Sequence, residues 1–112
     1  MATVVKQDVS TLGALNANST IIDVSDSDFI ACQSVGTFVG TVTFHSSNDG
    51  VAWHIFAMHP TATTVATADS NGVTGPSTQS KPTNGIKYFK TQMTAYTSGT
   101  VTMHTLCTRY GK

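Results

Sequence analysis

The chain has 112 residues, of which 39% are hydrophobic, and this is enough for one modest core and a single domain over residues 1–112. Six basic side chains balance six acidic ones, so no positive field would gather nucleic acid or anionic lipid. Threonine is the commonest residue, glutamate is absent and only 11% of residues are charged, which favours β-strands over solvent-facing helices.

Runs of alternating apolar and polar residues recur along the chain with turn signals between them, as in a β-sandwich or barrel. We expect an all-β protein, a single β-sandwich or barrel domain with about eight strands. The predicted strands are Thr3–Val9, Thr20–Val24, Asp28–Val35, Thr37–Ser46, Val51–Met58, Thr63–Ala68, Ile86–Thr97 and Gly99–Arg109. The polar stretch Asp69–Gly85 is predicted to be the largest loop and a candidate contact surface.

The first predicted hairpin reverses at Ser47-Asn48-Asp49-Gly50, where residues that tolerate positive φ or bond their own backbone are clustered. Alternation places Phe38, Val42 and Phe44 on the core side of its first strand. On the return strand Val51, Trp53 and Ile55 are predicted to return to the core. The outward face then reads His54, Phe56 and Met58, and apolar side chains on that face predict contact with another chain.

The second predicted hairpin spans residues 86–109 and turns at Thr97-Ser98-Gly99. Phe89, Met93 and Ala95 share the parity predicted for the core. Tyr88 and Tyr96 share the opposite, hydrophilic parity, so we expect both rings to be exposed and available for a protein or sugar contact.

Two strings in these hairpins, GTFVGTVTFHSSNDGVAW and KYFKTQMTAYTSGTVTMHT, resemble the small β-sandwich virion structural proteins of tailed bacteriophages. The resemblance covers about half the chain, and similar strings recur in capsid decoration, neck and tail proteins. It implies a virion component with a single β-sandwich of jelly-roll or immunoglobulin-like type, assembled in the host cytoplasm.

Three groups of side chains suggest chemistry, but simpler interpretations are favoured. The four histidines, His45, His54, His59 and His104, have no carboxylate partner in the motif, so exposure or subunit contact is predicted in place of a metal site. The carboxylates of Asp23, Asp26 and Asp28 match no full calcium loop, and an Asx-bonded turn is favoured. We therefore expect no metal and no cofactor.

Catalysis is not expected, because no serine lies in a nucleophile elbow and no cysteine stands beside a histidine in a motif. The N-terminus lacks the basic start and apolar stretch of a secretory signal, and no segment reaches the roughly 20 apolar residues of a membrane helix. We therefore expect a chain made in the cytoplasm, no membrane contact, and Cys32 and Cys107 as buried thiols, with a disulfide as the alternative.

These observations predict a phage capsid decoration (cement) protein that acts by protein–protein contact alone and stabilises the head. Its expected partners are itself, as a homo-oligomer and specifically a trimer, and the major capsid protein or another virion protein. The alternative is a neck- or tail-associated binding module that contacts a receptor or glycan.

Overall fold

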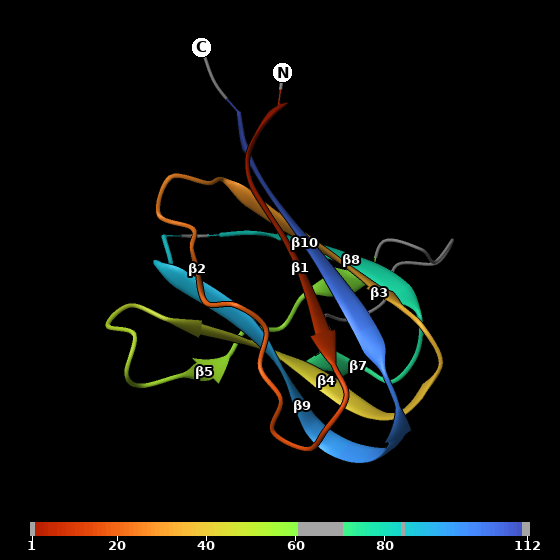
Figure 1. The fold of residues 1–112 in the computed structure, drawn as a ribbon. Coiled ribbons are helices and arrows are strands. Elements are labelled where there is room, and N and C mark those ends of the chain that lie inside the picture. Colours follow the sequence, from red (N-terminus) through yellow and green to blue (C-terminus); the bar gives the residue numbers. More distant parts are fainter. Residues whose placement is uncertain (1, 61–70, 84, 111–112) are drawn as a thin grey trace.

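The computed structural model describes residues 2–60, 71–83 and 85–110 (Figure 1). These residues form two five-stranded antiparallel sheets, as predicted for an all-β sandwich. Their strands are β1 (Ala2–Leu12), β2 (Ile22–Asp23), β3 (Phe29–Val35), β4 (Phe38–Ser47), β5 (His54–Ile55), β6 (His59–Pro60), β7 (Gly72–Val73), β8 (Ser77–Pro82), β9 (Tyr88–Gly99) and β10 (Val101–Tyr110). Within the described part of the chain, no helix has the length and apolarity to cross a membrane.

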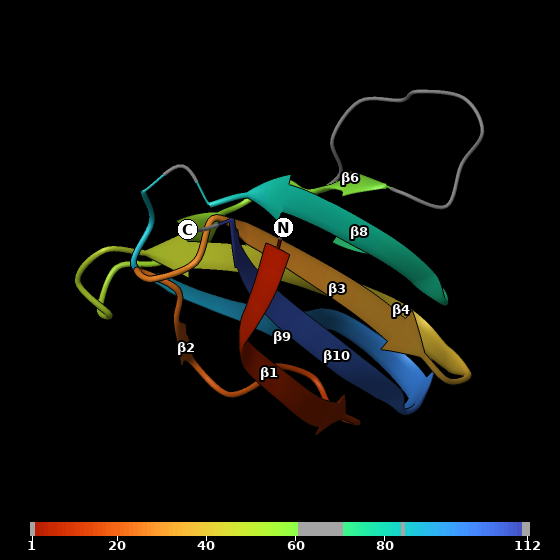
Figure 2. The same ribbon diagram turned by 90° about the horizontal axis from the view of Figure 1, so that it is seen from above.

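The two layers are clear when the molecule is seen from above (Figure 2). Sheet A has the strand order β1-β10-β3-β8-β6. Sheet B has the order β2-β9-β4-β5, and β7 also pairs with β4. The edge strands β1 and β2 therefore end the two sheets on the same side of the sandwich (Figure 2).

The core fills the space between the sheets and is built from alternate residues of the long strands, because successive side chains of a strand point to opposite faces. Phe89 lies near its centre, stacked on Phe44 at a centroid distance of 6.5 Å and edge-to-face with Phe56 at 6.0 Å. The remaining large, fully buried side chains are Leu12, Ile30, Met58, Met93, Met103, Val24, Val42 and Val101. The predicted core parity of β4, β9 and β10 is thus largely confirmed, although Ala95 is exposed.

Two predicted turns are present. Asn48-Asp49-Gly50 follows β4, and the Asp49 carboxylate accepts the N–H groups of Val51 and Ala52 at 2.8 and 2.9 Å. Gly99 joins β9 to β10 with a φ of +85°, and a Cβ there would lie 2.3 Å from the carbonyl oxygen of Thr37. Only glycine fits that conformation and that close approach.

Two predictions need correction, and a third is not tested. Val51–Met58 is not one strand: β5 contains two residues, and the chain then continues to β6. Asp69–Gly85 is not a single loop, because β7 and β8 lie within it. The predicted strand Thr63–Ala68 lies outside the described residues.

Candidate protein interface

The outer face of sheet A carries exposed apolar side chains and few charges. The register of β1, β10 and β3 places Val9 beside His104 and Leu106 beside Ala31 on this face. Val4 is 54% exposed, Val9 57% and Val35 43%, while Leu106 is half-buried. Among the described residues that face outward here, none is a lysine, an arginine or a carboxylate; they are Val4, Gln7, Val9, Thr11, Phe29, Ala31, Gln33, Val35, His59, Thr78, Ser80, Pro82, Thr102, His104, Leu106, Thr108 and Tyr110. Covering this face would strip water from no formal charge, which keeps the cost of burial low.

Part of strand β1 does not follow the apolar-in, polar-out alternation that is common in sandwich strands. Its charged residues Lys6 and Asp8 pair with Cys107 and Thr105, whose side chains point into the sandwich. Val4 and Val9 point outward, into solvent. A β-bulge between Val4 and Lys6 brings these two valines onto one face, although they are an odd number of positions apart.

An aromatic pair closes one end of this outer face. Phe29 and Tyr110 meet edge-to-face with their ring centroids 5.2 Å apart. The Tyr110 N–H donates to the Asp28 carboxylate at 2.8 Å, which ties the end of β10 to the turn before β3. Aromatic side chains held in one orientation are common anchors of protein interfaces.

The contact face predicted from His54, Phe56 and Met58 is wrong for two of its three members. Met58 is fully buried and Phe56 is 9% exposed, packed on Phe89, while His54 is exposed. The alternation used for the prediction does not apply, because the chain leaves regular strand geometry after Ile55. Phe56 and Met58 are therefore core residues.

Trp53 was predicted to lie in the core with its strand neighbours, and the structure contradicts this. Its ring is half-buried, and the Lys90 ammonium lies 4.7 Å from the ring centroid. Val51 is 83% exposed and Ile55 48%. After the turn, β5 therefore forms the edge of sheet B by pairing with β4, and the Trp53 ring lies over the outer face of that sheet beside Lys90.

Tyr88 and Tyr96 are half-buried, so each presents only part of its ring. The Lys87 ammonium lies 5.5 Å from the Tyr88 centroid. Tyr96 packs partly against the core cluster. Tyr88 and Tyr96 lie eight positions apart on β9, so the structure does not bring the two tyrosines together in one site; His54 lies on β5, across β4 from the Tyr88 end of β9.

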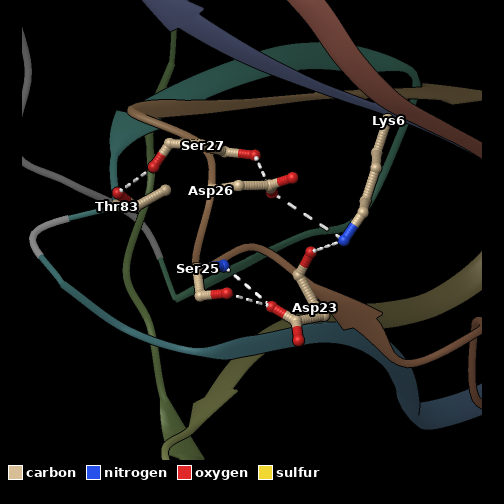
Figure 3. Close-up of polar contacts among 6 residues, drawn as sticks. All are labelled: Lys6, Asp23, Ser25, Asp26, Ser27 and Thr83. Carbon is tan, nitrogen blue, oxygen red and sulfur yellow. Dashed lines mark hydrogen bonds and ion pairs between the residues drawn. The ribbon is translucent and has the colours of Figure 1, made fainter.

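The acidic segment before β3 forms a hydrogen-bonded turn (Figure 3). The Asp23 carboxylate accepts the N–H of Ser25 at 2.9 Å and its hydroxyl at 2.6 Å, which lowers the pKa of Asp23. Lys6 donates to the Asp23 carbonyl, and its ammonium lies 3.8 Å from the Asp26 carboxylate. The turn predicted at residues 25–28 is present, and its Asx bond is made by Asp23, just before it.

Within the described residues, no group of three histidine, cysteine or acidic side chains is placed to hold a metal ion. His45 is half-buried, and its Nε2 lies 2.6 Å from the Thr43 hydroxyl. Burial, followed by the nearby charge of Lys90, lowers the pKa of His45 and favours the neutral imidazole.

The two cysteines are buried free thiols, as favoured from sequence. Burial raises the pKa of Cys32 to about 12, from an ordinary value of 9.0. The Thr105 hydroxyl lies 3.8 Å from its sulfur, and this contact acts in the opposite direction, toward a lower pKa.

This shift predicts a loss of stability in alkali. Above about pH 9 the unfolded chain gains a thiolate that the folded chain cannot form, so unfolding becomes easier until the pH passes the folded-state pKa of about 12. Melting temperatures measured from pH 8 to 11 should fall more steeply for the natural protein than for Cys32→Ala. Parallel slopes for the two proteins would show that Cys32 is not protected by burial.

No protein-family model matches this sequence, and no curated protein matches it. A solved structure, the SPBc2 prophage-derived protein YomS, superposes with a TM-score of 0.69 over 94% of this chain and 97% of that chain, at 6% sequence identity. A subunit of Bacillus endospore appendages, described as a family of disulfide-linked pili, gives a TM-score of 0.43 at 20% identity over 98% of this chain and 92% of that chain. The first likeness shows a shared fold; the second is too distant to carry an argument.

Proposed function

We propose that this protein is a structural component of a tailed-phage virion and that it decorates the capsid, stabilising the head by protein–protein contact. The outer face of sheet A is the proposed attachment surface. The observation that carries this proposal is the arrangement of β1, which turns Lys6 and Asp8 inward and leaves Val4 and Val9 in solvent. Such an arrangement raises the exposed apolar area of the free protein, and burying that area against a partner would stabilise the complex.

Two further observations support the proposal. The fold is shared with a prophage-derived protein, and both hairpin strings resemble small virion proteins of tailed phages. The uncharged outer face also suits attachment through burial of apolar area. A standard interface of about 1,600 Å² in total is sufficient for stable attachment, and many copies on a capsid lattice would add their contributions.

A neck- or tail-associated binding module that contacts a receptor or glycan is the second candidate. It is favoured by one observation: the half-exposed Trp53 ring lies on the outer side of sheet B, with Lys90 and His45 on the neighbouring strands. An exposed indole is a suitable platform for a sugar ring. Lys90 already covers part of that ring, which weakens this candidate.

Virions assembled without this protein distinguish the two candidates. If it decorates the capsid, depleted particles should release DNA at a lower temperature than complete ones and should adsorb to host cells at the normal rate. Adding back the purified protein should restore heat resistance. Depleted particles that remain heat-stable but fail to adsorb would overturn the capsid proposal in favour of receptor binding.

A further inference from the structure

Strand β1 leaves one long edge of sheet A open. It pairs with β10 along its whole length, and no strand of the described residues pairs with its other side. Along its 11 residues, alternate backbone N–H and C=O groups therefore point away from the sheet. Such an edge is a template for strand addition, in which main-chain hydrogen bonds provide affinity and side chains set the register.

Of the two charged residues on this edge, Lys6 has a partner of opposite charge among the described residues and Asp8 does not. Lys6 contacts the Asp23 carbonyl and lies 3.8 Å from the Asp26 carboxylate, and its side chain is 38% exposed (Figure 3). The Asp8 carboxylate accepts the Ser10 hydroxyl at 2.7 Å. Within the described part of the chain, no lysine or arginine forms an ion pair with Asp8. The edge therefore offers a carboxylate that would gain from a neighbouring cation.

We propose that a second copy of this chain pairs with β1 in antiparallel orientation, across a two-fold axis at Gln7. Gln7 is the midpoint of Ala2–Leu12, so this register pairs most of the strand with itself, and the bulge at Val5 shifts the pairing by one residue beyond Lys6. It also places Lys6 opposite the partner's Asp8 and Asp8 opposite the partner's Lys6. Opposite charges in directly facing positions stabilise a strand pair, and a two-fold axis supplies the contact twice.

The neighbouring registers that keep both outer faces on the same side are less favourable. An axis at Lys6 places two lysines opposite each other, and an axis at Asp8 places two carboxylates opposite each other. An axis at Val9 leaves the first residues of β1 unpaired and places Asp8 opposite a serine. Charge and strand length thus favour the same register.

The proposed pairing extends sheet A across the two subunits and joins their outer faces into one larger surface. It differs from the trimer expected from sequence, whose predicted contact residues Phe56 and Met58 are buried. It does not depend on where the protein sits on a virion, so it stands or falls separately from the capsid proposal.

Cysteine cross-linking of the full chain tests this register directly. Directly opposite residues of an antiparallel pair have Cα atoms about 4.5–5.5 Å apart, which is within the range of a disulfide. Gln7→Cys should therefore form a covalent dimer rapidly under mild oxidation at micromolar concentration. Thr11→Cys is the matched control on the same outward row: its two copies would be staggered by roughly 27 Å along the strands and should not cross-link.

A second measurement uses charge. Asp8→Lys places two lysines opposite each other at both contacts, and it should raise the dimer dissociation constant in sedimentation at least tenfold, with melting curves showing that the variant folds. Faster cross-linking through Thr11→Cys or Val9→Cys than through Gln7→Cys would overturn the proposal. A natural protein that sediments as a monomer at 100 µM would also overturn it.

Discussion

Replacing Leu106 with aspartate should weaken binding of the purified protein to depleted phage heads by about 100-fold, which corresponds to about 2.7 kcal/mol. Leu106 lies near the middle of the outer face of sheet A, next to Ala31 on β3. In the bound state, the new carboxylate would be buried among apolar side chains, with no lysine or arginine among the described residues of this face. Binding is measured by co-sedimentation of labelled protein with the heads.

Two valines of similar exposure provide the matched comparison. Val35 on β3 is 43% exposed on the outer face of sheet A, and Val39 on β4 is 56% exposed on the opposite side of the molecule. Val35→Asp should weaken head binding by about tenfold, and Val39→Asp should leave it unchanged within twofold. If Val39→Asp had the larger effect, the attachment surface would lie on sheet B.

Phe89→Ala should lower the free energy of unfolding by about 3–5 kcal/mol, the range for truncating a large buried aromatic side chain. Phe89 is fully buried and contacts the rings of both Phe44 and Phe56. The cavity would therefore open at the centre of the sandwich, where both sheets contribute. Denaturant unfolding followed by Trp53 fluorescence measures the loss.

Trp53→Ala is the comparison for this core truncation, followed by circular dichroism because the variant lacks tryptophan. A half-buried ring with a cation at 4.7 Å should contribute only about 1 kcal/mol. If Trp53→Ala lowered the free energy of unfolding as much as Phe89→Ala, Trp53 would have to be a core residue. A loss below 1 kcal/mol for Phe89→Ala would contradict the packing described here.

The long hairpin β9–β10 and strand β4 could largely be predicted because their apolar residues alternate regularly, in β9 as far as Met93; beyond it, bulges shift the phase and leave Ala95 exposed. Phe89, Met93, Val101 and Met103 keep one parity on each strand, and all four are buried. Thr97-Ser98-Gly99 also marks the turn correctly, since Gly99 adopts the positive φ that the reversal needs.

The direction of side chains could not be predicted correctly where the chain departs from a regular strand. Alternation predicts the burial of Val51–Met58 only if the whole segment is a strand, but only two of its residues form β5. Val51 and Ile55, predicted to be buried, are therefore exposed, while Phe56 and Met58, predicted to be exposed, are buried. In β1 the bulge at Val5 shifts the phase by one residue, so the shared face of Val4 and Val9 is hidden in the sequence. The proposed attachment face therefore emerged only from the three-dimensional register.

Strand β8 was missed because its sequence, STQSKP, has no apolar residue apart from its final proline. It is held to β3 by main-chain pairing and by hydroxyl contacts that a periodicity rule does not detect. The Ser34 hydroxyl donates to the Gly75 carbonyl at 2.9 Å and accepts the Ser77 N–H at 3.0 Å. Polar strands of this kind depend on tertiary pairing that a single sequence does not reveal.

Imaging of purified virions, with this protein located by its own density, tests the central claim most directly. We expect copies on the outside of the head at repeated lattice positions, with the outer face of sheet A against the capsid and Trp53 directed away from it. Density confined to the neck or tail, or attachment through sheet B, would contradict that account.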